Sequence, residues 1–540
     1  MTRRRAARPA LAHVAAHFAA YVDAYALLGG AAVAGAQAAP AAPAGKAVYD
    51  EWCAGCHGVD GKGDGPAADR MLPQPRDFTR GVFQIRTTAS GELPTDADLQ
   101  RVIDEGMPGT AMPGWKAHLT GRERSDVLAY IKTFSTFFAG AKPTAIALGS
   151  APAASDAGLR EGRAAYRTLE CFKCHGEAGR GDGPSAPTLK DDWGHPIRAA
   201  DLTASWRFNG GSAVEQIHTR LRTGLDGTPM PSYADAVESR VVTAEQLWRV
   251  AQYVRSLSPE RPPEPREVIR AARVERGLPR GPADSAWAAA PRHYVPLVGQ
   301  VIRKPRWFAP TVHALWVQAL HDDRQLALRV TWTDPSRSPS PAWNEWLERV
   351  RGAVTSVDAP LGAAQGPDRL ALWFPAGASS GGELPYFLGG SARRPVYALR
   401  WTSDPDRLEE GTGTGLGRFA AQGGAPEATH SVRYANGEWQ LQVTRALTPR
   451  DTARGARFAP GAATPIAFFA ADGSNGEDEV RGAVSAWYAV HLDVPTPRVA
   501  YASPVAAMLV TAGLGSLLVR RAQRRARDDD NGSSSEREAT

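Results

Sequence analysis

The chain has 540 residues, more than one hydrophobic core normally organises, and its length predicts about three domains of roughly 150 residues each. Hydrophobic residues make up 43% and charged residues 22%, which excludes a disordered chain and a polytopic membrane protein, and four cysteines exclude a disulfide scaffold. Much of the net charge of +6 lies at the ends, because residues 1–38 carry +3 and residues 520–540 carry +1. The remaining +2 excludes a broad basic face for nucleic acid.

Residues 1–38 predict an export signal. Four arginines within the first eight residues precede an alanine-rich stretch, and Ala36-Gln37-Ala38 fits the small-x-small cleavage pattern. Two histidines and Asp23 interrupt the apolar stretch. An uncleaved membrane anchor is therefore the alternative interpretation of this segment.

All four cysteines fall into two CxxCH motifs, at residues 53–57 and 171–175, which are 118 residues apart. In a c-type haem site two thiols form thioethers with the haem vinyl groups, and the adjacent histidine reaches the iron. The motifs therefore predict two covalently bound haem c groups. The attachment residues are Cys53, Cys56, Cys171 and Cys174, and the iron ligands are His57 and His175. The alternative, one zinc site built from both CxxC pairs, explains neither histidine nor the similarity of the flanking sequences.

The repeat continues through a glycine-rich loop. Residues 57–66 read HGVDGKGDGP and residues 175–184 read HGEAGRGDGP. Such glycines predict a tight loop with positive φ angles beside the porphyrin edge. We interpret Asp64 and Asp182 as turn formers rather than catalytic groups.

Met112 and Met230 each lie 55 residues after the histidine of their copy, in the sequences GTAMP and GTPMP. A thioether sixth ligand completes a haem iron for electron transfer and raises its reduction potential. Met107 competes for this role in the first copy, but its equivalent in the second copy is Leu225. We therefore predict that Met112 and Met230 are the sixth ligands and that Met107 is a packing residue.

His118 and His218 raise the alternative of iron ligated by two histidines. Neither has a histidine at the equivalent place in the other copy, which disfavours this alternative.

Each copy is also framed by helical patterns. Tyr49 and Tyr166 lie one turn before the CxxCH motifs on the expected opening helices, and apolar residues with helical spacing close the copies over 127–138 and 247–257. The order of helix, CxxCH, glycine loop, Met-Pro and closing helix resembles the class I cytochrome c fold. The resemblance covers residues 44–142 and 156–260 and implies two all-α haem domains that transfer electrons.

After Ser258 the composition changes. Four prolines between residues 259 and 265 predict a stiff linker, which continues as a charged stretch to about residue 283. From residue 284 onward apolar residues alternate with period two, and Asn436-Gly437 between two such runs predicts a tight hairpin. The predicted strands are 326–332, 370–374, 396–401, 432–434, 439–443, 466–469 and 484–492. This pattern predicts an antiparallel β-sandwich.

Four short motifs follow one another in this region: RVTWTD at 329–334, LALWFP at 370–375, PYFLG at 385–389 and VSAWY at 484–488. Their order resembles the haem-b-binding γ subunit of ethylbenzene dehydrogenase and related molybdenum enzymes. The resemblance implies a β-sandwich that holds a haem b between a methionine and a lysine. It also implies electron exchange with the iron–sulfur subunit of a molybdopterin oxidoreductase.

The ligands that this resemblance requires are missing here. The methionine would be expected near Leu388 and the lysine just before Val484, but no methionine occurs between residues 231 and 507, and Lys304 is the only lysine after residue 190. We therefore predict a sandwich without haem b that serves as a docking surface. The alternative ligands are the histidines of the region, which are His293, His313, His321, His430 and His491.

Val499 to Val519 is a run of 21 uncharged residues, about 31 Å as a helix and long enough to cross a bilayer. Five arginines lie among the next eight residues. By the positive-inside rule, the tail at 520–540 is cytoplasmic and the domains before the span lie in the periplasm.

These patterns predict a multidomain chain with two all-α cytochrome c domains, an all-β sandwich and one transmembrane helix. The expected segments are 1–38 (signal), 39–142 (first cytochrome domain), 143–155 (linker), 156–260 (second cytochrome domain), 261–283 (linker), 284–498 (sandwich), 499–519 (transmembrane helix) and 520–540 (tail).

The expected function is electron transfer at the cytoplasmic membrane rather than catalysis. The expected partners are redox proteins, with iron–sulfur and molybdopterin subunits as candidates, and no nucleic acid. One alternative is a dihaem peroxidase or oxidase, which needs a vacant sixth position that both methionines argue against. Another alternative is a redox-sensing module whose sandwich binds a ligand.

Overall fold

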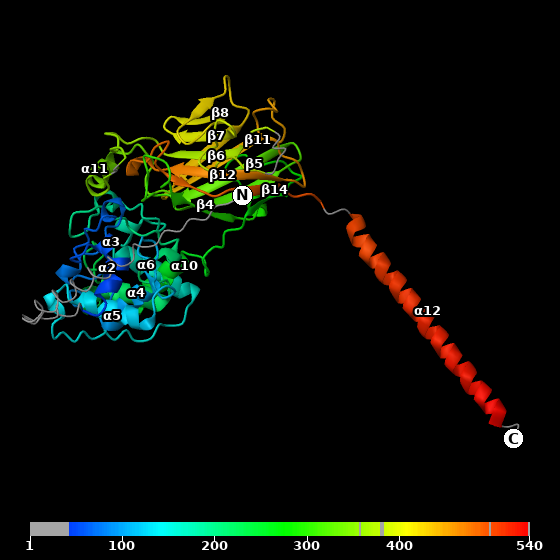
Figure 1. Ribbon diagram of the computed structural model, residues 1–540, viewed down its shortest axis with the longest axis horizontal. Helices are drawn as coiled ribbons and strands as arrows, with labels where there is room; N and C mark the ends of the chain where they lie inside the picture. The colour runs from blue at the N-terminus through cyan, green and yellow to red at the C-terminus, as the bar shows by residue number, and fades with distance from the viewer. Residues whose placement is uncertain (1–42, 356–357, 378–382, 496–497, 538–540) are drawn as a thin grey trace, which may run out of the picture.

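The computed structural model of the chain describes residues 43–355, 358–377, 383–495 and 498–537, so the predicted export signal lies outside the described residues. Figure 1 shows a helical part built from the N-terminal half, a β-rich part packed against it, and one long helix that extends away from both.

The helical part consists of two successive bundles. The first contains α2 (Lys46–Trp52), α3 (Ala54–His57), η1 (Ala68–Arg70), η2 (Phe78–Arg80), α4 (Asp96–Glu105), α5 (Gly121–Lys132) and η3 (Thr136–Phe138). The second contains α6 (Asp156–Thr168), α7 (Phe172–His175), η4 (Ala186–Thr188), η5 (Ser205–Arg207), α8 (Val214–Thr223), α9 (Ala234–Glu238) and α10 (Ala244–Ser256).

Polar side chains cap the helices that close the two bundles. Thr120 and Glu123 form a capping box at the start of α5, and Thr243 and Gln246 do the same for α10. The stripe predicted at 127–138 is only partly helical, because α5 ends at Lys132. The aromatic side chains of residues 134 and 138 follow the helix end and still pack against the first core.

The β-rich part contains two sheets that share one strand. Its strands are β1 (Val268–Arg273), β2 (His293–Pro296), β3 (Val298–Gly299), β4 (Ala314–His321), β5 (Gln325–Thr333), β6 (Arg369–Pro375), β7 (Val396–Ser403), β8 (Asp406–Gly413), β9 (Phe419–Ala421), β10 (Thr429–Ala435), β11 (Glu438–Ala446), β12 (Ala463–Ala471), β13 (Ala483–Val484) and β14 (Tyr488–Leu492). The strand order is β10-β11-β5-β4-β1-β14-β12-β6-β7-β8-β9. The first half of β12 pairs with β14 and its second half with β6, so β12 passes from one sheet to the other.

The two sheets face one another across a buried aromatic core, as in a sandwich. Trp401 on β7 lies 5.8 Å from Trp332 on β5 and 4.9 Å from Trp439 on β11, measured between ring centroids. All three side chains are buried. The predicted β-sandwich is therefore the architecture of this part of the chain.

Two features of the β-rich part differ from the sequence-based prediction. Residues 268–273, which we expected to lie in the linker, form β1, and β1 runs parallel to both β14 and β4. The sheet is therefore mixed rather than purely antiparallel. Only Ile269 and Ala271 of β1 are fully buried, which is too short an alternation among arginines to mark a strand. A helix, α11 (Asn344–Ala353), also lies in a region where only strands were expected.

The predicted hairpin is confirmed. β10 and β11 pair up to Ala435 and Glu438, so the loop consists of Asn436 and Gly437, with φ angles of 51° and 70°. Positive φ at both loop residues matches the twist of the flanking strands.

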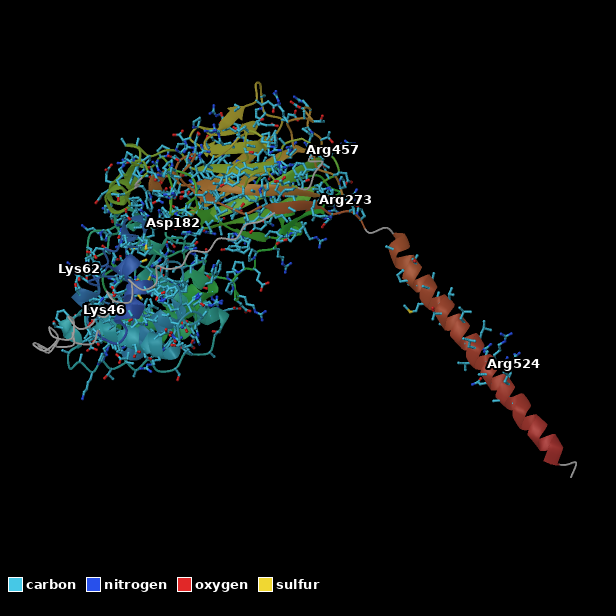
Figure 2. The ribbon with its side chains drawn as sticks, viewed as in Figure 1. Lys46, Lys62, Asp182, Arg273, Arg457 and Arg524 are labelled. Carbon is cyan, nitrogen blue, oxygen red and sulfur yellow. The ribbon has the colours of Figure 1, made fainter. Side chains whose placement is uncertain are left out.

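The C-terminal helix is α12 (Arg498–Arg537). Within it, Ala502–Arg527 is long and apolar enough to cross a membrane by length and composition, and none of this segment is buried against the rest of the molecule. Figure 2 shows Arg524 on this helix, far from the two globular parts.

Candidate functional site

Both CxxCH motifs fold in the same way. The first cysteine of each motif precedes a four-residue helix, α3 or α7, that ends on the histidine. His57 Nδ1 lies 3.0 Å from the carbonyl oxygen of Arg76, and His175 Nδ1 lies 3.0 Å from that of Ala200. Because a carbonyl can only accept, Nδ1 carries the proton in each ring and Nε2 is left as the metal ligand. Burial lowers the pKa of both histidines, which favours the neutral imidazole that a metal requires.

A buried tyrosine fixes the end of each motif. The Tyr49 hydroxyl donates to the carbonyl oxygen of Gly58 at 2.7 Å, and the Tyr166 hydroxyl donates to that of Gly176 at 2.8 Å. Both side chains are buried. The repeat therefore preserves this hydrogen bond as well as the cysteines.

None of the four cysteines forms a disulfide. Burial raises the pKa of the Cys53 thiol and of the Cys171 thiol to about 11. Among the described residues, the four cysteines form no group of metal-ligating atoms within 4.8 Å of one another. This arrangement disagrees with a single zinc site built from both pairs.

The glycine loops have the predicted backbone. Gly58 and Gly176 have φ angles of 76° and 78°. A Cβ atom on either glycine would lie 2.1 Å or less from the carboxylate of Asp64 or Asp182, respectively. Each aspartate therefore packs into the space left by the missing side chain, in keeping with a structural role.

The two Met-Pro loops are equivalent in their hydrogen bonds. Met107 N donates to Met112 O at 3.0 Å, and Leu225 N donates to Met230 O at 3.0 Å. The next contact is also shared, since Met112 N bonds the Thr110 hydroxyl and Met230 N bonds the Thr228 hydroxyl. This pattern confirms that Met107 is the counterpart of Leu225 and Met112 that of Met230.

The second motif opens into a cavity of about 940 Å³. Its lining includes Cys171, Cys174, His175 and Met230, so the four residues predicted to hold the second haem face one space. Ligand pockets of this kind measure about 300–1,000 Å³, and the donor set of two thiols, an imidazole and a thioether suits a covalently attached haem.

The two histidines considered as alternative ligands lie elsewhere. His118 is exposed. His218 is buried and stacks on Trp248 with ring centroids 3.6 Å apart. Among the described residues that line the second cavity, Met230 is present and His218 is not.

The first bundle contacts the segment that carries the second Met-Pro loop. Arg86 of the first bundle is fully buried, forms a 2.7 Å ion pair with Asp226 and donates to the Thr223 carbonyl oxygen at 2.6 Å. Asp226 also accepts from the backbone N–H of Gly91 at 2.8 Å. Asp226 lies four residues before Met230, so the first bundle holds the loop that carries the second methionine. Nothing in the sequence spacing marks Arg86 for this role.

A second contact joins the first bundle to the second site. The Arg76 guanidinium lies over the Trp193 ring at 4.6 Å, and the Arg76 carbonyl oxygen is the partner of His57. Residues 109–111 of the first Met-Pro loop line the cavity of the second motif. The structure thus brings the two candidate sites next to one another.

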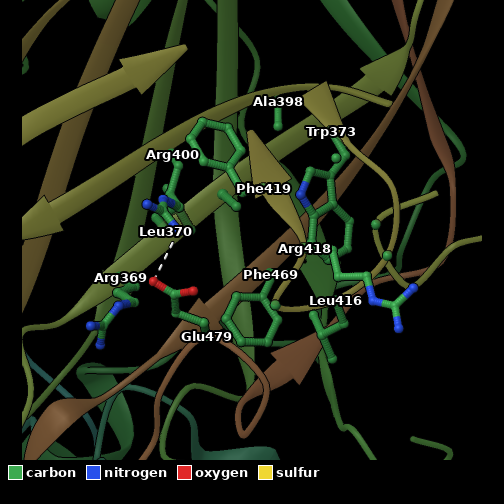
Figure 3. Close-up of a pocket in the computed structure, with 15 residues that line it drawn as sticks. Arg369, Leu370, Trp373, Ala398, Arg400, Leu416, Arg418, Phe419, Phe469 and Glu479 are labelled. Carbon is green, nitrogen blue, oxygen red and sulfur yellow. Dashed lines mark hydrogen bonds and ion pairs between the residues drawn. The ribbon is translucent and has the colours of Figure 1, made fainter. Parts of the chain in front are cut away.

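In the sandwich, the places expected for haem b ligands are filled with packed side chains. Leu388 is 2% exposed and shares an apolar cluster with Trp373, Phe469 and Val484. Next to Leu388, the structure has a pocket of about 40 Å³, and Figure 3 shows the side chains around it. Arg481, where a lysine was expected, pairs with Asp478 at 2.8 Å.

The five sandwich histidines have different surroundings. His293 accepts from Arg270 N, His321 bonds the Asp493 carbonyl oxygen, His430 pairs with Asp406 and His491 pairs with Asp493. His313 instead lines the cavity of the second CxxCH motif. Four of the five candidate ligands are therefore held by protein partners, and the fifth faces the second cavity.

Comparison with protein-family models gives two matches. Residues 40–131 match the family described as cytochrome c oxidase, cbb3-type, subunit III, and residues 159–258 match the family described as cytochrome c. No curated protein matches the chain significantly.

Solved structures show further similarities. A chain of the reducing HAO-like protein complex of Kuenenia stuttgartiensis is 41% identical, with 40% of this chain and 96% of that chain covered and a TM-score of 0.38. A carbohydrate binding module of family 9 from Caldicellulosiruptor kristjanssonii, in complex with glucose, is 10% identical, with 42% of this chain and 97% of that chain covered and a TM-score of 0.24.

Proposed function

Because the chain contains two cytochrome c domains, at residues 40–131 and 159–258, we propose that it relays electrons through two haem c groups while anchored in the cytoplasmic membrane. The observation that carries this proposal is the contact between the two domains. Arg86 and Asp226 join the first domain to the loop of the second methionine, and residues 109–111 of the first methionine loop line the second cavity. Adjacent sites suit electron transfer within one chain.

Each residue of the repeat has a separate role in this proposal. Cys53 and Cys56 hold the first haem and Cys171 and Cys174 the second, while the histidines of the two motifs bind iron through Nε2. Met112 and Met230 would supply the sixth ligands. When bound, the haem groups supply one-electron chemistry at the iron, and the thioether ligands favour the reduced state. Two protein ligands per iron would leave no position for substrate, which favours a carrier over a peroxidase or oxidase.

The proposed location of the chain at the membrane is inferred from α12. Its apolar segment is long enough to cross a bilayer, and the five arginines that follow Val519 favour the cytoplasmic side for the tail. The haem domains and the sandwich then lie in the periplasm, where haem c attachment takes place.

The sandwich in this proposal is a docking surface for the iron–sulfur subunit of a molybdenum oxidoreductase and carries no haem b. The order of its strand motifs supports an iron–sulfur subunit as the partner, because that order resembles the γ subunit of ethylbenzene dehydrogenase. The missing methionine and lysine ligands support a sandwich without haem b.

Carbon monoxide binding to the reduced, purified full-length chain tests the carrier function. A chain with two six-coordinate haems c should bind less than stoichiometric carbon monoxide and show negligible turnover of hydrogen peroxide. Stoichiometric binding at either haem, together with peroxide turnover, would show an open iron and favour the enzyme alternative. The molybdenum content of the complex isolated from native membranes tests the partner separately, and its absence would contradict that assignment.

A further inference from the structure

The sandwich forms part of the wall of the second haem cavity. Phe308, Thr311, His313 and Trp316 line the cavity from the sandwich side, together with Cys174 and His175 of the second motif. The boundary is held at several further points. Arg180, beside the second glycine loop, forms a 2.8 Å ion pair with Glu438 next to the β10–β11 hairpin. Figure 2 shows Asp182 of the same loop at this boundary. Charges on the sandwich therefore lie at the boundary with the bundle that carries the second CxxCH motif.

Arg198 crosses this boundary. It lines the second cavity, and its Nη2 donates to the Thr311 hydroxyl at 2.8 Å. The guanidinium lies over the Trp346 ring at 4.8 Å, which fixes its plane. Its Nη1 is buried without a hydrogen-bond partner and lies 4.0 Å from Asp472 Oδ2. The charge of Arg198 is thus held between the haem cavity and a carboxylate of the sandwich.

Asp472 belongs to a buried acidic cluster. One carboxylate oxygen from each of Asp334, Asp368 and Asp472 lies within 4.8 Å of the others, and all three side chains are fully buried. Asp472 Oδ2 also has no hydrogen-bond partner. A buried carboxylate with an unpaired oxygen interacts strongly with a nearby cation, because little water screens the pair.

The same loop reaches the iron ligand. Arg198 lies two residues before Ala200, whose carbonyl oxygen accepts the hydrogen bond from His175 Nδ1 at 3.0 Å. Partners of this kind set the orientation and basicity of a ligating histidine. A contact that holds Arg198 therefore also holds the group that orients His175.

We propose that the charge of Arg198, through its pairing with Asp472 across the domain boundary, sets the reduction potential of the second haem; this inference rests on the proposed electron-transfer function. Reduction lowers the positive charge at the iron by one. The Arg198 cation beside the cavity favours the reduced state, and the Asp472 carboxylate opposes it. Arg198 lines the second cavity, so this pair acts chiefly on the second haem.

Spectroelectrochemical titration of the full-length chain tests this inference, with the first haem as an internal control. Arg198→Met should lower the potential of the second haem and Asp472→Asn should raise it. Each shift should correspond to about a threefold to tenfold change in the ratio of reduced to oxidised haem, where tenfold is about 59 mV for a one-electron couple. Arg198→Lys, which keeps the charge, should retain most of the parent potential. A Met230→Ala variant identifies which wave belongs to the second haem.

Arg349→Met is the matched control variant, because Arg349 donates across the same boundary to the Pro187 carbonyl oxygen at 2.7 Å but is not among the described residues lining the cavity. It should leave both potentials unchanged. The inference is overturned if Arg198→Met and Asp472→Asn shift the potential in the same direction, which indicates loosening of the site, or if neither shifts it. It is also overturned if both haems shift equally.

If Arg198→Met does not fold, Arg198→Gln replaces it, because glutamine removes the charge and keeps a polar side chain at the boundary. The same signs are then required, with a lower potential in Arg198→Gln and a higher one in Asp472→Asn. A chain lacking two reversible one-electron waves would instead contradict the proposed function.

Discussion

Met107 and Met112 stand five residues apart in the first cytochrome domain, and the comparison of the two copies predicts different roles for them. The backbone of Met107 bonds the backbone of Met112 in the same way that Leu225 bonds Met230. A leucine cannot ligate iron, so the position shared by Met107 and Leu225 needs only an apolar side chain. The position shared by Met112 and Met230 has a thioether side chain in both copies of the repeat.

Met112→Ala should remove part of the near-infrared band of Met-ligated ferric haem and lower one of the two potentials by on the order of 0.1 V, since axial ligands set haem potentials over a range of about 0.8 V. Met107→Ala is the control and should change neither property. Absorbance spectroscopy with redox titration measures both. Loss of the band in Met107→Ala, with the band kept in Met112→Ala, would reverse the assignment.

Tyr166→Phe should lower the free energy of unfolding of the second cytochrome domain by about 1–3 kcal/mol, because the buried Gly176 carbonyl oxygen loses its hydrogen bond from the hydroxyl. Denaturant unfolding followed at the haem absorbance measures this change. Tyr253→Phe is the matched control, since the Tyr253 ring packs edge-on against Tyr166 and keeps that contact. An unchanged stability in Tyr166→Phe would show that the hydrogen bond contributes nothing.

Among the elements, the sequence pattern predicts α12 but does not predict β1. The strand β1 carries two buried residues among arginines, and its pairing with β4 and β14 depends on segments that are about 50 to 220 residues away. Local alternation could not reveal it. The helix α12 depends only on its own composition, so its apolar run can be recognised from the order of its residues.

Removal of α12 by truncation after Arg498 should release the rest of the chain from the membrane as a soluble protein with both haems. The reason is that Ala502–Arg527 is the membrane-spanning candidate among the described residues. Fractionation of cells followed by haem staining measures the outcome. A truncated chain that stays in the membrane after an alkaline wash would show that residues 1–38 act as an uncleaved anchor.

Across the molecule, the three globular parts share their functional surfaces. The first cytochrome domain holds the methionine loop of the second through Arg86, and the sandwich closes the second cavity. The cavity of the second CxxCH motif is therefore lined by residues from more than one domain. This arrangement predicts that the two haems respond differently to changes in the sandwich.

The full-length chain should contain two haems c and no extractable haem. The thioether bonds resist acid acetone, whereas a haem b in the sandwich would dissolve. A pyridine haemochrome assay before and after extraction measures both kinds of haem. An equimolar extractable b-type haem that disappears on changing one of the five sandwich histidines would show that the site persists with new ligands.

Features that depend on local spacing could be predicted from the order of the amino acids. The CxxCH motifs, the Met-Pro loops, the hairpin at Asn436 and the apolar run of α12 each lie within a short stretch of chain, so periodicity and residue types were sufficient. The contacts between residues far apart in the sequence could be identified only in the tertiary structure. Arg198 and Asp472 are 274 residues apart, and Arg86 and Asp226 are 140 apart, yet each pair is in contact. Such contacts depend on how the domains pack, because burial rather than spacing strengthens an ion pair, and no local pattern encodes that packing.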